Sequence, residues 1–215
     1  MKKLLIVLAA CAACLAAALT GCSQSVDYSS FISEMRSEIY TYSDDNKSVT
    51  LYCVRREQPY NADGICGEPC ELIEIYVELP QNPTLLEVAT EGFAGEMNYE
   101  AVENRFTASY THAPLGVDYV DVTLVADGTE QTVRALNVKD SSVMSCTDAL
   151  ICAVQHDKEL FTSLTSGAYF NGEIFVRLLY DEGCYYFVGV CDRDGKITAW
   201  LLDGISGKVI ATKKM

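Results

Sequence analysis

Apolar and polar residues alternate along much of residues 49–138, and this pattern predicts β-strands. Alternation with a period of two places one set of side chains on a buried face and the other toward solvent. Val, Ile, Thr and Tyr, which favour strands, recur in these segments. The predicted strands cover residues 49–54, 72–79, 85–89, 105–110, 119–125 and 132–138. Asp127-Gly128 predicts a hairpin turn between the last two.

The short strands and frequent turns predict an antiparallel β-sandwich, immunoglobulin-like in the broad sense. The Cys…Trp…Cys signature of true immunoglobulin domains is absent from the sequence. The prediction therefore concerns architecture and not family membership.

Helical spacing occurs at two places. Phe31, Met35 and Ile39 are four residues apart and predict a short N-terminal helix that starts near residue 30. Ser145 and Asp148 have the spacing of a capping box, which predicts the start of a second helix. Apolar residues with helical spacing follow it: Leu150, Ala153, Val154, Phe161 and Leu164.

A meander of strands follows the second helix. It is predicted at residues 173–180, 185–191, 196–202 and 208–212. The change of pattern near residue 140 predicts a helix-plus-sandwich domain over residues 30–140 and an α+β domain over residues 141–215. The overall fold class is α+β.

The N-terminus has the layout of a secretory signal. A cationic Met1-Lys2-Lys3 precedes an uncharged apolar run over residues 4–19, which is short for a membrane-spanning helix of roughly 20 residues. Leu19-Thr20-Gly21-Cys22 resembles the lipobox of bacterial lipoproteins. The resemblance implies cleavage of residues 1–21, lipid on Cys22, a tether over residues 22–29 and a location on the extracytoplasmic face of the cell membrane. An uncleaved anchor, or an ordinary signal with a chance cysteine, is the alternative.

The charge balance narrows the choice of partners. Without residues 1–21 the chain carries 14 Lys and Arg against 30 Asp and Glu. So acidic a chain argues against nucleic acid and against adsorption on anionic lipid, since both require basic patches. We expect a monomeric exported protein whose acidity favours solubility.

Seven cysteines remain beyond Cys22, and an odd number in an exported protein leaves at least one unpaired. Cys66 and Cys70 are separated by three residues in a loop rich in Gly and Pro. They fit a small-loop disulfide, two free thiols, or part of a zinc site with His112 and Cys53. Elsewhere, Asp192-x-Asp194-Gly195 faintly resembles a calcium loop, but an Asp-Gly hairpin explains it without a metal. No cofactor is expected.

Aromatic residues are candidates for a binding face on the C-terminal meander. Tyr185, Tyr186 and Trp200 would provide rigid contact area if they were exposed. The alternative is that both sides of these strands are buried.

Residues 141–215 resemble a PepSY-type module. The resemblance rests on the helix segment Asp148-Ala149-Leu150-Ile151-Cys152-Ala153-Val154-Gln155-His156 and on the closing run Asp203-Gly204-Ile205-Ser206-Gly207-Lys208-Val209-Ile210. A longer loop than usual, over residues 163–172, departs from the pattern and puts the register of the first strand in doubt. The resemblance implies binding or restraint of peptidases and other envelope proteins, and it brings no catalytic residues.

These observations predict a non-enzymatic lipoprotein that binds an envelope protein or peptide. The second hypothesis is a metal- or small-ligand-binding lipoprotein that uses the Cys66–Cys70 loop. A hydrolase is the third, because carboxylate pairs cannot be assessed in so acidic a sequence. Neither His112 nor His156 has a nucleophile motif beside it, so no catalytic residue is predicted.

Overall fold

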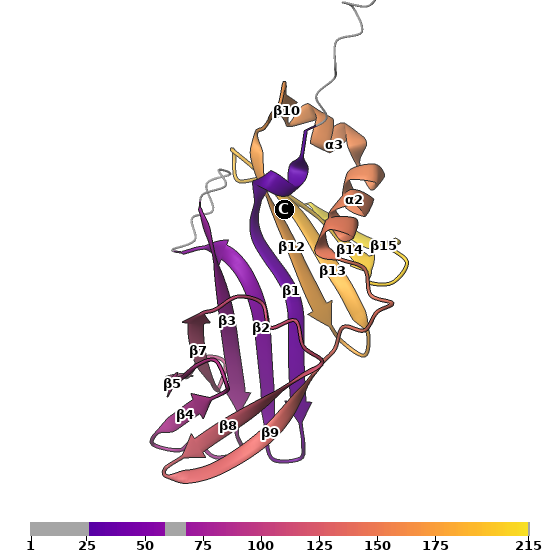
Figure 1. The fold of residues 1–215 in the computed structure, drawn as a ribbon. Helices are drawn as coiled ribbons and strands as arrows, with labels where there is room; N and C mark the ends of the chain where they lie inside the picture. Colours follow the sequence, from indigo (N-terminus) through magenta and orange to yellow (C-terminus); the bar gives the residue numbers. More distant parts are fainter. Residues whose placement is uncertain (1–25, 59–67, 215) are drawn as a thin grey trace, which may run out of the picture.

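The computed structural model describes residues 26–58 and 68–214 (Figure 1). Cys22, the whole signal segment and Cys66 lie outside this part of the chain. The described chain is mainly antiparallel β-structure, as the alternating pattern predicted. Its helices are α2 (Cys146–His156), α3 (Lys158–Ser163) and the short 3-10 helix η1 (Tyr28–Phe31). Its strands are β1 (Ile32–Ser43), β2 (Ser48–Glu57), β3 (Pro69–Glu78), β4 (Leu86–Ala89), β5 (Ala94–Glu96), β6 (Asn98–Glu100), β7 (Arg105–Thr111), β8 (Tyr119–Ala126), β9 (Thr129–Asn137), β10 (Thr165–Ser166), β11 (Tyr169–Phe170), β12 (Gly172–Tyr180), β13 (Cys184–Asp192), β14 (Ile197–Asp203) and β15 (Val209–Lys214).

The predicted N-terminal helix is wrong, because the residues from Ile32 onward form strand β1. A spacing of four residues is even, so it satisfies the period of a strand as well as one face of a helix. β1 pairs with β12 on one side and with β2 on the other, and these ladders satisfy its backbone groups. Register shifts interrupt β1 between Ile32 and Glu34 and between Arg36 and Glu38, which hides the alternation in the sequence.

One sheet runs through both predicted domains. Its order is β15-β14-β13-β12-β1-β2-β3-β7-β6, and β9, β8, β4 and β5 continue from β1 as a second layer. The pairing of β1 with β12 is parallel and joins the start of the described chain to its C-terminal meander. Strands from residues 32–43 and 172–180 therefore lie side by side near the middle of the molecule (Figure 1).

Two hydrophobic cores lie on the same side of this sheet where β1 pairs with β12. The helix-covered core lies between α2 and β12–β14, and its large buried side chains include Phe161, Tyr186 and Trp200. The strand-covered core lies between β2–β3–β7 and the layer β4–β8–β9. The strand register shows this arrangement. Met35, which packs on the helix-covered core, is paired with Arg55 of β2. Arg55 points to the same side of β2 as Cys53, which belongs to the strand-covered core. Figure 1 likewise shows α2 and the β8–β9 pair on the near side of the sheet. Farther along β1, Ile39 and its cross-strand partner Tyr52 point to the other side and pack against the edge of the helix-covered core.

Local turn chemistry follows the sequence. Asp127 and Gly128 have positive φ angles of 46° and 84° and join β8 to β9 as the predicted hairpin. At the other aspartate-rich turn, the Asp192 side chain accepts the backbone N–H groups of Asp194 and Lys196, and Gly195 has a φ of 78°. The carboxylate of Asp192 therefore closes the β13–β14 turn. No helix in the described part of the chain is both long and apolar enough to cross a membrane.

Candidate functional site

The predicted aromatic binding face is wrong for two of its three residues. Tyr186 and Trp200 are buried in the helix-covered core, with exposed fractions of 0% and 1%. The Tyr186 hydroxyl donates to the Met144 carbonyl at 2.6 Å, and the Trp200 ring stacks on Phe161 with centroids 5.7 Å apart. α2 covers the side of β13 and β14 to which these residues point, whereas Tyr185 points to the opposite side and is half-buried.

That opposite side is the candidate functional site, and we call it the uncovered face. Strand register places Glu34 and Arg36 of β1 beside Phe175 and Arg177 of β12, pointing away from both cores. The face continues onto neighbouring strands through side chains that share this direction: Tyr52, Arg56, Glu74, Tyr76, Arg105 and Phe187. The buried residues of α2 and α3 belong to the helix-covered core, and those of β4, β8 and β9 belong to the strand-covered core. None of these covering elements therefore packs on the uncovered face.

An ion pair crosses the junction between β1 and β12. Arg177 binds Glu34 through two parallel contacts, Nε to Oε1 at 2.7 Å and Nη2 to Oε2. Glu34 is only 7% exposed, and the rings of Phe175 and Phe187 lie 5.5 and 5.6 Å from the Arg177 guanidinium carbon. The bidentate geometry fixes the guanidinium beside these two aromatic rings.

A second group links arginine and tyrosine across β1, β2, β3 and β7. The Arg36 guanidinium lies 4.0 Å from the Tyr52 ring centroid, and the Arg105 guanidinium lies 4.1 Å from that of Tyr76. The two tyrosine rings meet edge to face at 5.4 Å. These four side chains form a continuous run in which two tyrosine rings lie between two arginines.

Glu74 connects Tyr76 of this run to Arg56. It accepts the Tyr76 hydroxyl at 3.1 Å and pairs with Arg56 at 2.7 Å, while only 7% of Glu74 is exposed. Burial raises the pKa of Tyr76 to about 12, so its hydroxyl remains a donor at neutral pH. The Nε–H groups of Arg36 and Arg56 are buried and meet no hydrogen-bond acceptor among the described residues.

Two hollows lie along the uncovered face. One of about 390 Å³ is lined by Arg56, Glu74, Tyr76 and Arg105 together with side chains of β6 and β7. The other, of about 190 Å³, lies where β1 leaves β12 and is lined by residues that include Arg36 and Tyr52. The described part of this surface offers aromatic contact area and guanidinium donors.

The cysteine and histidine side chains that were predicted to share a zinc site have different partners in the described part of the chain. The Cys53 thiol donates to Glu38 at 3.2 Å, and burial raises its pKa to about 12, so it stays protonated. Cys70 contacts Gln58 at 3.4 Å, whereas His112 packs edge-on against Phe93. Across residues 26–58 and 68–214, no three His, Cys, Asp or Glu side chains are grouped as a metal site. The Cys66–Cys70 pairing is not tested, because Cys66 lies outside the described residues.

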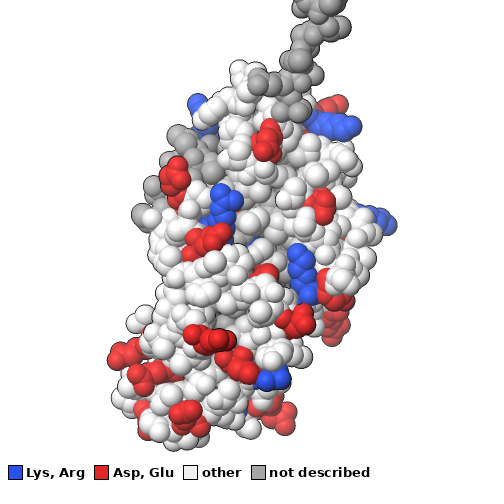
Figure 2. Space-filling model, viewed as in Figure 1, with Lys and Arg blue, Asp and Glu red and all other residues white. Residues whose placement is uncertain are grey.

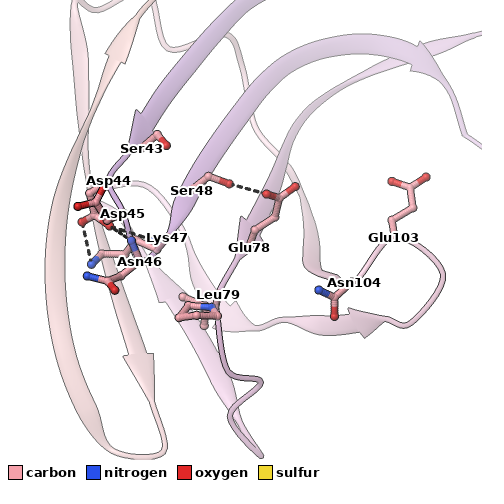
Figure 3. Close-up of a pocket in the computed structure, with 11 residues that line it drawn as sticks. Ser43, Asp44, Asp45, Asn46, Lys47, Ser48, Glu78, Leu79, Glu103 and Asn104 are labelled. Atoms are coloured by element: carbon pink, nitrogen blue, oxygen red, sulfur yellow. Dashed lines mark hydrogen bonds and ion pairs between the residues drawn. The ribbon is translucent and has the colours of Figure 1, made fainter.

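An acidic hollow of about 440 Å³ lies at the β1–β2 hairpin (Figure 3). Asp44 accepts the backbone N–H groups of Asn46 and Lys47 and the hydroxyl of Tyr42 at 2.7 Å. The Tyr42 hydrogen bond is the main reason that the pKa of Asp44 falls to about 2. Glu78 accepts the Ser48 hydroxyl at 3.1 Å, and Figure 3 shows Glu103 directed away from Asp44. These contacts close a turn, and the carboxylates do not converge on a common point.

The uncovered face was missed in the sequence because β1 was predicted to be a helix. A signal in the sequence could have revealed this face. Tyr52 and Arg56 on one strand, and Glu74 and Tyr76 on the next, stand at even-numbered positions and therefore point to the side opposite the apolar residues of the core. Comparison with protein-family models, with curated proteins and with solved structures finds no match for this chain.

Proposed function

We propose that the protein is a non-enzymatic, lipid-anchored envelope protein that binds another protein or peptide through its uncovered face. The observation that carries this proposal is the run Arg36–Tyr52–Tyr76–Arg105 on a sheet face that none of the described helices or strand layers covers. Tyr and Arg are enriched among the residues that dominate binding energy at protein interfaces. Beside this run, the ion pairs of buried Glu34 with Arg177 and of buried Glu74 with Arg56 hold two further arginines in place, which lowers the entropy lost when a partner binds.

The membrane anchor in this proposal rests on the resemblance of residues 19–22 to a lipobox. Val26, the first described residue, follows Cys22 by four positions. An extended chain spans at most about 3.5 Å per residue, so the folded part would start within roughly 14 Å of the lipid. Lipid on Cys22 would hold the protein at the extracytoplasmic face of the cell membrane.

The finer architecture is part of the same proposal. A PepSY-like module over residues 141–215 is supported by α2, which is capped by Ser145 and packs the small residues Ala149 and Ala153 on the strands that follow. The turn after Asp203, whose side chain accepts the backbone N–H of Ser206, occupies the place of the family's closing turn. The two-layer arrangement around the strand-covered core supports an immunoglobulin-like sandwich in the broad sense.

The non-enzymatic part of the proposal is supported by the chemistry of the thiols. Burial raises the pKa values of Cys53, Cys146 and Cys184, which disfavours the reactive thiolate. Metal or small-ligand binding by the Cys66–Cys70 loop is the alternative. Metal analysis of the purified protein, before and after Cys70→Ser, tests it directly.

A capture experiment tests protein binding. The full chain is immobilised and exposed to detergent-solubilised envelope extract, and bound proteins are identified by mass spectrometry. We expect one enriched partner that is lost with Tyr76→Ala or Arg36→Ala. Tyr169→Ala is the matched control, because Tyr169 is 49% exposed and has Arg193 over its ring but does not lie on the uncovered face.

Retention of the partner by both uncovered-face variants would contradict the proposal. Circular dichroism of each variant, compared with the unmodified chain, separates loss of binding from loss of folding.

A further inference from the structure

A second surface lies on the outer side of the β4–β8–β9 layer. At its edge is a hollow of about 720 Å³ between the β4–β5 turn and the loop that precedes β8, and Val120 of the strand-covered core also lines it. The hollow is lined by both apolar and acidic residues: Glu91, His112, Leu115, Val117, Tyr119 and Asp121. Beside it, Val117, Tyr119 and Leu136 are 47%, 45% and 58% exposed. Tyr119 and Leu136 are directly paired across β8 and β9, and their side chains form an apolar patch that Arg134 borders, with its guanidinium carbon 3.9 Å from the Tyr119 ring centroid.

The walls of the hollow are fixed from within the fold. The Glu38 carboxylate accepts the Gly116 N–H at 3.1 Å, and the Tyr40 hydroxyl lies 3.3 Å from the Val117 nitrogen, which donates to it. On the opposite wall, Gly92 packs directly against His112, since a Cβ at Gly92 would lie 2.7 Å from the imidazole Nε2. An apolar patch beside hydrogen-bonded walls is pre-organised for a ligand.

The charges on the same layer favour a positively charged ligand. Register aligns Glu96, Glu87, Val125 and Glu130 in one row across β5, β4, β8 and β9, and no Lys or Arg stands in that row. Like charges directly opposite each other on a sheet are destabilising, and a cation would relieve this repulsion. Arg134, on the same outer side, is already bound to Asp121 by two contacts of 2.8 and 3.0 Å. Figure 2 shows acidic side chains gathered over the lower part of the molecule, where this layer lies.

We infer that this surface binds a basic amphipathic peptide segment. Its apolar side chains occupy the Val117–Tyr119–Leu136 patch and the adjoining hollow, and its Lys or Arg side chains lie over the glutamate row. The six-residue step along β8 from Tyr119 to Val125 corresponds to about 20 Å, the length of a short extended peptide. The surface is distinct from the uncovered face, so this inference does not depend on the function proposed above.

Fluorescence anisotropy with three labelled decapeptides tests the inference on the full-length protein in detergent. The probe alternates Leu and Lys, one control alternates Leu and Glu, and the other alternates Ser and Lys. We expect the Leu–Lys peptide to bind at least tenfold more tightly than either control. Its affinity should fall as salt rises, because the contact is partly electrostatic.

Matched variants locate the site. Leu136→Ser should weaken binding of the Leu–Lys peptide about tenfold, whereas Ile205→Ser should leave it unchanged, since Ile205 is 63% exposed but lies elsewhere. The double change Glu87→Gln and Glu130→Gln should weaken binding and reduce its salt dependence. Equal binding of the Ser–Lys peptide, or equal effects of Leu136→Ser and Ile205→Ser, would overturn the inference. Tyr76→Ala, on the uncovered face, should not change this binding, so each proposal can fail without the other.

Discussion

The two halves of the molecule cover one side of a shared sheet by different means. In the C-terminal half, α2 packs on β12, β13 and β14, the strands that follow it in the chain. In the N-terminal half, a second layer of strands closes over β2 and β3. The helix-covered core is rich in aromatic rings, which fill the wide gap between a helix and a sheet. The strand-covered core is mostly aliphatic, which suits two closely packed layers.

Charge separates the halves further. Residues 30–140 contain 20 Asp and Glu against 7 Lys and Arg, whereas residues 141–215 contain 9 against 7. A covering layer of strands has an outer face at every second residue, and in this protein that face carries four of the acids, Glu87, Glu96, Asp121 and Glu130. The charge of residues 141–215 is therefore nearly balanced, whereas the negative potential belongs to residues 30–140.

The largest expected effect tests whether the halves are energetically separate. Leu51→Ala removes a fully buried side chain from the strand-covered core and should cost about 3 kcal/mol of the free energy of unfolding. Because β1 contributes Ile39 to one core and Tyr40 to the other, both halves should lose stability together. Urea unfolding followed by far-UV circular dichroism and by the fluorescence of Trp200, which lies in the other half, measures this.

We expect the circular-dichroism transition and the Trp200 fluorescence transition of Leu51→Ala to move together to a lower urea concentration. An unchanged Trp200 transition would show that the halves unfold independently. Leu136→Ala, at a 58% exposed position, is the control and should change stability by less than about 0.5 kcal/mol.

A smaller effect is expected at the ion pair that joins the halves. Arg177→Met leaves the Glu34 carboxylate buried without its partner and should destabilise the fold by about 2 kcal/mol, a value reduced because the Arg177 side chain is 34% exposed. Adding Glu34→Leu removes the uncompensated charge and should recover most of the loss. Arg134→Met breaks an exposed pair with Asp121 and should cost less than about 0.5 kcal/mol. Chemical denaturation of these three variants and of the unmodified protein measures the losses, and a loss for Arg177→Met as small as that for Arg134→Met would contradict the prediction.

The smallest effect concerns acid pH in the acidic half. The pKa of Asp44 falls to about 2, below the value of about 3.9 for an unfolded aspartate. A lowered pKa means that the ionised carboxylate stabilises the fold above about pH 4, and that this contribution is lost as the pH falls toward 2. The melting temperature of the unmodified protein should therefore fall slightly more between pH 4 and pH 2 than that of Asp44→Asn. Asp45→Asn, at the adjacent exposed position, is the control, and parallel curves for all three proteins would refute the assignment.

Much of the strand content could be predicted because its signals are local. Alternation in residues 72–79 and 119–125, and the Asp127-Gly128 turn, depend on neighbours in sequence. β1 could not be predicted in this way, because register shifts break its alternation and its partner β12 lies more than 130 residues away. The candidate site depended on that strand, and so it was missed with it.

The sequence by itself determined the acidity of the chain, the turns, the mainly antiparallel strands and the Ser145 start of a helix, since each depends on short-range chemistry. Only the tertiary structure decided which side of each strand is covered. Tyr185 and Tyr186 are neighbours with the same ring, yet α2 packs over the side to which Tyr186 points, and Tyr185 points to the other side. Alternation divides a strand into two faces, but the element that packs on one of them comes from elsewhere in the chain, so local sequence cannot say which face remains available for binding.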